Sequence, residues 1–133
     1  MKISSEKEML DFASNFAKSL SLPAVIELVG DVGAGKTTFT RGLAKGLGVE
    51  SPVTSPSFTI SKRYALPGGS LVHYDFYRLP DPGLMADDLA DVLSEKNTVV
   101  VVEWGGSISD LLPENHHKIE IKLNEDGSRE VIL

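Results

Sequence analysis

The chain has 133 residues, 41% of them hydrophobic and 24% charged, so we expect one soluble globular domain over residues 1–133. Its 13 basic and 19 acidic residues leave a net charge of -6, which argues against a broad nucleic-acid-binding face and restricts RNA contact to a local patch or a partner. Without cysteine there is no disulfide or thiolate metal site, and without an apolar N-terminal stretch we predict a cytoplasmic protein with no membrane contact.

The first third of the chain predicts a helix, a strand and a second helix. Ser5 opens an S-x-x-E capping box, and apolar residues then recur every three or four positions to about residue 20. Residues 24–29 are short, branched and almost continuously apolar, which is typical of a buried parallel strand. The next helix is predicted over residues 36–47, where Gly48 ends it.

The rest of the chain is richer in strands. The further predicted elements are a hairpin of strands 58–65 and 71–77, a helix at 83–94, a buried strand at 98–103, and a terminal hairpin of 117–123 and 128–133. Together these elements indicate an α/β fold. We expect a P-loop NTPase-like domain with a central, mostly parallel sheet, helices on both faces and antiparallel hairpin strands.

Residues 30–37 match the Walker A pattern G-x-x-x-x-G-K-[ST], between the strand and the helix that this motif requires. Its three glycines are expected to take positive φ and to let the backbone approach phosphate oxygens. Main-chain N–H groups at the helix N-terminus then attract the anion, Lys36 adds an ammonium group, and Thr37 offers a hydroxyl to Mg²⁺. The motif predicts binding of a purine nucleoside triphosphate with Mg²⁺ by Gly30, Asp31, Val32, Gly33, Ala34, Gly35, Lys36, Thr37 and Thr38.

A site of this kind also needs a carboxylate near the metal, commonly at the end of a neighbouring strand. Glu103 ends the valine-rich strand, where it either serves the metal, through a water molecule, or simply meets solvent. Asp75 lies in an apolar strand and either approaches the Mg²⁺ and the attacking water or is held structurally by Arg78. We predict Lys36, Asp75 and Glu103 as catalytic residues and Thr37, Asp75 and Glu103 as the metal site; which carboxylate positions the water is left open.

Four further residues each allow two interpretations. Trp104, beside Glu103, belongs to the core or covers the nucleotide or a partner surface. His73 is more typical of a packed sheet residue than of a proton shuttle. Ser55 and Ser57 lie in a loop rich in proline and hydroxyl groups, which either responds to the γ-phosphate or is a stiff connection whose hydroxyls cap local backbone.

Four segments in order resemble the TsaE (YjeE) family of bacterial ATPases, and the resemblance extends over nearly the whole chain. The segments are GDVGAGKTTFTRGLAKGLG from Gly30, SPSFT from Ser55, HYDFYRL from His73 and VEW from Val102. The resemblance implies an α/β P-loop fold and a weak intrinsic ATPase needed for threonylcarbamoyladenosine synthesis at tRNA position 37. It also implies a complex with the TsaB–TsaD heterodimer, with tRNA contact indirect and the free protein a monomer or weak homo-oligomer.

Carried over by position, this resemblance implies roles for individual residues. Lys36 and Thr37 would bind phosphate and metal, while Asp75 and Glu103 would serve the metal and hydrolysis. The residues on the functional face would be Ser55, Ser57, Arg78 and Trp104. The chain departs from the common family pattern at Val32, at Ser57 and in the two glycines that follow Trp104.

Two other functions stay open from the residues alone. A small P-loop kinase would need an acceptor pocket and usually an arginine-rich lid, whereas this chain has four arginines and no insertion long enough for a lid. A nucleotide-gated interaction module with incidental hydrolysis is the second alternative. A GTPase is disfavoured because the chain has no N-K-x-D segment to recognise guanine, so ATP is the expected nucleotide.

Overall fold

The structure is a computed structural model that describes residues 1–31, 33–54, 61–76, 83–104 and 111–133. Its helices are α1 (Glu6–Lys18), α2 (Lys36–Leu47) and α3 (Gly83–Leu93). Its strands are β1 (Lys2–Ile3), β2 (Ala24–Val29), β3 (Ser61–Leu66), β4 (Gly69–Asp75), β5 (Thr98–Glu103), β6 (His117–Leu123) and β7 (Arg129–Ile132). None of the helices in these ranges combines the length and the apolar character needed to cross a bilayer.

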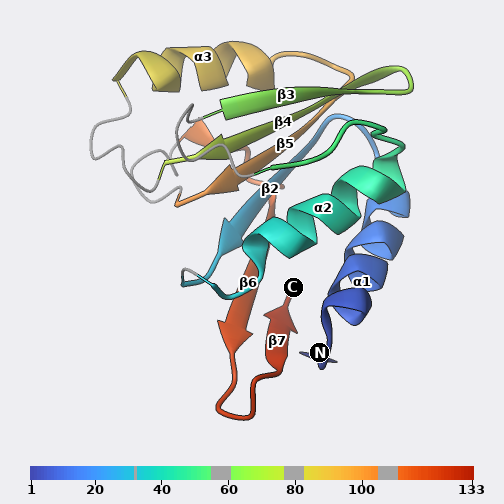
Figure 1. Ribbon diagram of the computed structural model, residues 1–133. Helices are drawn as coiled ribbons and strands as arrows, with labels where there is room; N and C mark the ends of the chain where they lie inside the picture. Colours follow the sequence, from blue (N-terminus) through green and yellow to red (C-terminus); the bar gives the residue numbers. More distant parts are fainter. Residues whose placement is uncertain (32, 55–60, 77–82, 105–110) are drawn as a thin grey trace.

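All of these strands join one seven-stranded sheet in the order β1-β7-β6-β2-β5-β4-β3 (Figure 1). The four central strands, β6, β2, β5 and β4, run parallel, and antiparallel pairs flank them at both edges. The predicted α/β fold is therefore confirmed. The register pairs Glu103 with Leu28 on one side and with Asp75 on the other, so the carboxyl ends of β2, β5 and β4 lie at the same edge.

The helices cover both faces of the sheet: α1 and α2 lie together on one face and α3 on the other (Figure 1). Alternate residues of β5 serve the two cores, because successive side chains of a strand point to opposite faces. Val99 and Val101 pack in the core under α1 and α2, and Val100 and Val102 in the core under α3. This double burial explains why β2 and β5 read as nearly continuous apolar runs.

Helices α1 and α2 are held close by small residues. An added Cβ at Gly42 would lie 2.6 Å from the carbonyl oxygen of Leu10 and 2.8 Å from the Cβ of Ala13. The predicted cap of α1 is confirmed, since the Ser5 hydroxyl accepts a hydrogen bond of 3.1 Å from the backbone N–H of Glu8. This packing sets the position of α2, whose first turn lies at the end of β2.

One local prediction was wrong in detail, and one short strand was missed. The hairpin turns at Pro67 and Gly68, more tightly than the five-residue connection expected, because Gly68 adopts a φ of 79°. The strand β1 was not predicted at all, since two residues are too few to show a period. It forms because its partners Arg129 and Glu130 arrive from the far end of the chain. As a result both termini lie near each other, and the Met1 ammonium donates to the Val131 carbonyl at 2.8 Å.

Candidate functional site

The Walker A segment forms the loop between β2 and α2. Glycine is required at its three glycine positions for two different structural reasons. Gly33 and Gly35 have φ values of 84° and 111°, in the left-handed region that favours glycine, as expected. The same expectation was wrong for Gly30, which is outside that region. An added Cβ at Gly30 would lie 2.5 Å from the carbonyl oxygen of Ile121, so close contact with β6 requires a glycine there.

The N-terminus of α2 opens from this loop. Gly35 is its N-cap, and within the described residues no side chain caps it and none of its first-turn residues is acidic. The free N–H groups of a helix start carry partial positive charge and attract anions. Thr37 and Thr38 are half-buried in the first turn, where the Walker A pattern predicts phosphate and metal contacts. The N-terminus of α2 is therefore a site that attracts anions, and the two threonines lie in its first turn.

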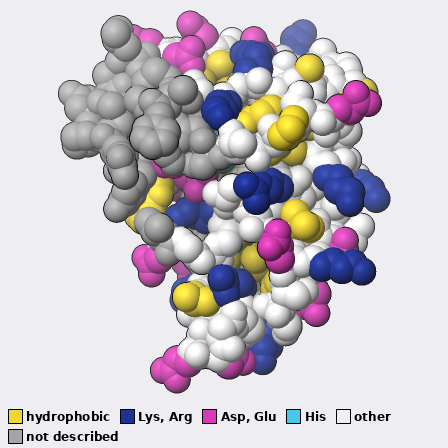
Figure 2. Space-filling model, viewed as in Figure 1, with side chains coloured by type: hydrophobic (Ala, Val, Ile, Leu, Met, Phe, Trp, Pro, Cys, Tyr) yellow, Lys and Arg dark blue, Asp and Glu magenta, His cyan; other side chains and the backbone are white. Residues whose placement is uncertain are grey.

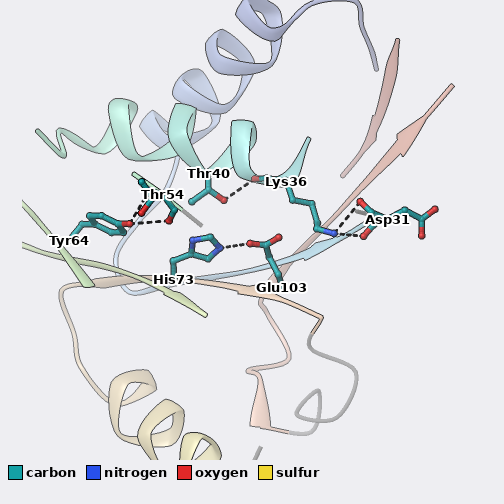
Figure 3. Close-up of polar contacts among 8 residues, drawn as sticks. Asp31, Lys36, Thr40, Thr54, Tyr64, His73 and Glu103 are labelled. Atoms are coloured by element: carbon teal, nitrogen blue, oxygen red, sulfur yellow. Dashed lines mark hydrogen bonds and ion pairs between the residues drawn. The ribbon is translucent and has the colours of Figure 1, made fainter. Parts of the chain in front are cut away.

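Lys36 is the buried cation of this loop, only 7% exposed. Its ammonium donates to the carbonyl oxygens of Gly30 and, at 3.3 Å, of Asp31 (Figure 3). Burial lowers the pKa of Lys36, while the negative charges of Glu103, Asp75 and Asp31 act in the opposite direction. The ammonium is thus a partly desolvated charge that is satisfied by its own loop.

The two predicted carboxylates lie side by side in the sheet. Asp75 ends β4 and Glu103 ends β5, and the two are register partners. Glu103 is 3% exposed and lies 2.5 Å from Nε2 of His73, which excludes the alternative in which it simply meets solvent. Asp75 is half-buried. Both charges act on the pKa of Lys36, so the structure brings together the three residues predicted as catalytic.

Trp104 follows Glu103 and lies over the lysine. Its ring centroid is 4.3 Å from the Lys36 ammonium, a cation–π arrangement. The side chain is 36% exposed, so the alternative that placed Trp104 in the core was wrong. Its φ of 57° is unusual for a bulky residue, and such a conformation costs on the order of 1–3 kcal/mol and persists only where the surroundings enforce it. The ring therefore covers the lysine and still presents a face to solvent.

Some predicted residues cannot be compared with the structure. Val32, Ser55, Ser57 and Arg78 lie outside the described residues. The roles predicted for them, including the alternative pairing of Arg78 with Asp75, stay predictions.

Arg129 is a residue of this site that the sequence analysis missed. From β7 its Nε donates to the carbonyl of Ala34 at 2.9 Å, and its Nη2 donates to that of Gly33 at 3.3 Å. A third bond, from Nη1 to the carbonyl of Gly127 at 2.5 Å, ties the guanidinium to its own hairpin. No local pattern marks this residue, because an arginine beside a hairpin turn is ordinary and its two partners in the Walker A loop are more than 90 residues away.

A cavity of about 290 Å³ lies next to the loop. Its walls combine the start of α1, the first turn of α2 and the terminal hairpin, and they include Ser4, Ser5, Met9, Thr38, Gly127 and Arg129. Outside it, acidic and basic side chains are interspersed on the face shown in Figure 2, and they do not gather into one basic surface. The cavity thus lies directly beside the Walker A loop and has a mixed polar and apolar lining.

The fold and the site define a class: an α/β protein with a Walker A motif at the end of a central parallel strand and two carboxylates on neighbouring strands. The profile of the TsaE family, described as threonylcarbamoyl adenosine biosynthesis protein TsaE, matches residues 3–131. The chain belongs to this family of biosynthesis proteins.

Individual relatives agree with this assignment. The chain is similar to tRNA threonylcarbamoyladenosine biosynthesis protein TsaE of Bacillus subtilis, with 44% identity over 108 residues, 80% of this chain and 66% of that protein. The protein of the same name from Streptomyces coelicolor is 40% identical over 115 residues, 85% of this chain and 78% of the relative. The crystal structure of Bacillus subtilis YdiB has a TM-score of 0.78 and 34% identity, covering 98% of this chain and 80% of that one.

Proposed function

We propose that this chain is a Mg²⁺-dependent ATP-hydrolysing subunit that supports threonylcarbamoyladenosine modification of tRNA position 37 together with a TsaB–TsaD complex. The modification follows from the family to which the chain belongs. The hydrolytic role has its main support in one observation. A buried lysine ammonium, an uncapped helix start and two strand-end carboxylates converge on the Walker A loop.

The residues fit a nucleoside triphosphate. Lys36 is desolvated and bonds carbonyl oxygens of its own loop, contacts that a phosphate oxygen would replace with a full opposite charge. The N–H groups at the start of α2 would bind further phosphate oxygens. The cavity beside Gly35 and Thr38 has the polar and apolar lining that a ribose and a base require, and it gives the nucleotide a direction in which to extend.

The donor set also fits Mg²⁺. Within the described ranges, no three His, Asp or Glu side chains form a cage that could hold a metal alone. Mg²⁺ commonly keeps several waters and binds through one or two carboxylates plus substrate phosphates, so a cage is not required. Thr37 would offer a hydroxyl, and Asp75 and Glu103 would hold the ion or its waters. When bound, the ion would neutralise charge that develops on the phosphates.

Each side chain then has a defined task. Lys36 would balance the charge of the β- and γ-phosphates, and its burial would strengthen that interaction because water screens it less. One of Asp75 and Glu103 would orient the attacking water while the other serves the metal. Trp104, partly exposed above Lys36, would offer the partner complex a contact that senses whether the loop is occupied.

The experiment combines calorimetry of Mg²⁺·ATP binding with a phosphate-release assay. Lys36→Ala is expected to lower hydrolysis by about a hundredfold or more, because a principal group facing the transferred phosphate is removed. The matched control is Lys45→Ala, an exposed lysine on the same helix, which should behave like wild type. Hydrolysis by Lys36→Ala at the wild-type rate would refute the site.

Two further measurements test the rest of the proposal. Asp75→Asn and Glu103→Gln should lower turnover more than they weaken Mg²⁺·ATP binding, since one of the two carboxylates orients the attacking water and the other serves an ion that the phosphates also hold. A pull-down with purified TsaB–TsaD in ATP, in ADP and without nucleotide should show nucleotide-dependent association. Transfer of phosphate to an added acceptor would instead indicate a kinase, and nucleotide-dependent association without hydrolysis would indicate an interaction module.

A further inference from the structure

His73 and Glu103 form a buried pair under the Walker A loop. The His73 side chain is fully buried on β4, and its Nε2 lies 2.5 Å from Oε2 of Glu103 on β5 (Figure 3). His73 is two residues before Asp75 in the same strand, on the sheet face that α1 and α2 cover. The imidazole therefore lies on the inner side of the two strand-end carboxylates.

The other ring nitrogen shows which way this hydrogen bond runs. Nδ1 of His73 is buried and is the one such side-chain nitrogen or oxygen, among the described residues, that has no hydrogen-bond partner. A carboxylate has only acceptor oxygens, so the contact with Glu103 needs a proton on Nε2, whereas a proton on Nδ1 would be a buried donor without an acceptor, at a cost of about 1–3 kcal/mol. The proton is therefore placed on Nε2, which donates to the Glu103 carboxylate.

This bond restricts the Glu103 side chain. In Figure 3 its carboxylate lies between the imidazole of His73 and the side chain of Lys36, and the charge of Glu103 acts on Lys36. One carboxylate oxygen is occupied by His73, and the rotation of the group is limited. Lys36 meanwhile bonds carbonyl oxygens of its own loop.

We propose that His73 is a positioning residue, whose Nε2–H holds the Glu103 carboxylate in the orientation needed for metal-bound water. The inference rests on the proposed function, because it takes Glu103 as the carboxylate that serves the metal and hydrolysis. His73 itself touches neither nucleotide nor water in this role. A partner that orients a ligand or its carboxylate affects metal-dependent activity by about ten- to a hundredfold in other proteins.

The test compares His73→Gln with His73→Asn. A glutamine amide nitrogen can take the place of Nε2, whereas an asparagine amide nitrogen reaches only the place of Nδ1, so the two variants match in polarity but differ in donor position. His73→Gln should keep most of the wild-type kcat. His73→Asn should lower kcat by about ten- to a hundredfold with little change in KM. In a Glu103→Gln background the asparagine change should have little further effect, since the group that it positions is already altered.

A second measurement does not depend on activity. With ¹⁵N-labelled histidine, the wild-type spectrum should contain a slowly exchanging, downfield Nε2–H proton from one of the three histidines. That signal should vanish in His73→Gln and move in Glu103→Gln. Absence of the signal from folded wild-type protein, or its persistence in His73→Gln, would overturn the assigned hydrogen bond.

The outcomes separate the two proposals. If wild-type protein hydrolyses ATP and His73→Asn is as active as His73→Gln, the positioning role is wrong while the proposed function stands. If both variants lose activity only in proportion to lost thermal stability, His73 is a structural residue and the inference is also overturned. If wild-type protein does not bind Mg²⁺·ATP, the proposed function fails and the role of His73 fails with it, even where the histidine signal is present.

Discussion

The Lys36 ammonium lies 4.3 Å from the centroid of the Trp104 ring, with carbonyl oxygens of its own loop as its hydrogen-bond acceptors. Trp104 and Lys36 are far apart in the sequence, and the end of β5 brings the ring over the start of α2. A phosphate that draws the ammonium away from these carbonyl oxygens would change what lies beneath the indole. If the loop binds a nucleotide as proposed, the environment of Trp104 would therefore change with its occupancy.

Trp104 is the sole tryptophan of the sequence, so its fluorescence reports directly on this contact. We expect Mg²⁺·ATP to change the emission of wild-type protein, because the nearby cation and the polarity around the ring both change. Lys36→Met should alter the emission without ligand and remove the response to nucleotide, whereas Lys45→Met should match wild type. Identical spectra for wild type and Lys36→Met would contradict the stacking of lysine and ring.

Lys36→Met should also stabilise the ligand-free protein, by about 1 kcal/mol, as commonly found when a functional group that costs stability is removed. Burial lowers the pKa of Lys36, so below that lowered pKa the charged lysine costs folding free energy. The gain should be complete at pH values below that lowered pKa. It should shrink as pH rises from the lowered folded-state pKa toward the ordinary lysine value, because the folded lysine is then neutral.

Denaturant unfolding of wild type and Lys36→Met at pH 7 and near pH 10 measures this effect. The methionine keeps most of the buried hydrocarbon, so lost packing should not mask the result. A variant less stable than wild type at pH 7 would mean that the contacts of the ammonium outweigh its desolvation.

Arg129→Ala should weaken Mg²⁺·ATP binding by about tenfold, or about 1.4 kcal/mol, because the loop loses two hydrogen bonds that orient its carbonyl groups. Arg129→Lys should recover little of this loss, since an ammonium keeps the charge but lacks the fixed fork of donors. Calorimetry measures both, with Lys122→Ala, at an exposed lysine on β6, as the control. Full recovery in Arg129→Lys would show that charge alone matters.

Gly42→Ala should destabilise the protein by about 1–3 kcal/mol through overpacking between α1 and α2. Helix propensity alone favours alanine over glycine by about 1 kcal/mol. The sign of the measured change in stability therefore tests whether overpacking outweighs propensity. The added Cβ would lie 2.6 Å from the Leu10 carbonyl oxygen, and backbone cannot yield as a flexible side chain can. A rise in the midpoint of thermal unfolding would indicate that the two helices are farther apart than described.

Local features of the sequence were enough for most of the secondary structure. The predicted bounds of β2, α2, β5 and β6 are those of the structure, and the terminal hairpin is also confirmed. Continuous apolar runs, a capping box and a complete Walker A pattern are signals that lie within a few residues of each other. They report the local backbone because strand and helix periods, turns and caps are decided over short distances.

The sequence by itself thus determined the α/β class, the family resemblance and the positions of Lys36, Asp75 and Glu103. Only the tertiary structure decided how these groups are satisfied. His73 meets Glu103 across 30 residues, and Arg129 reaches the loop across 95. Such contacts depend on strand order, register and helix packing, which bring distant segments together. They produce no local periodic pattern in the sequence. The same reason explains why the role of Gly30 was mispredicted. A positive φ was expected there, whereas glycine is required because β6 approaches closely.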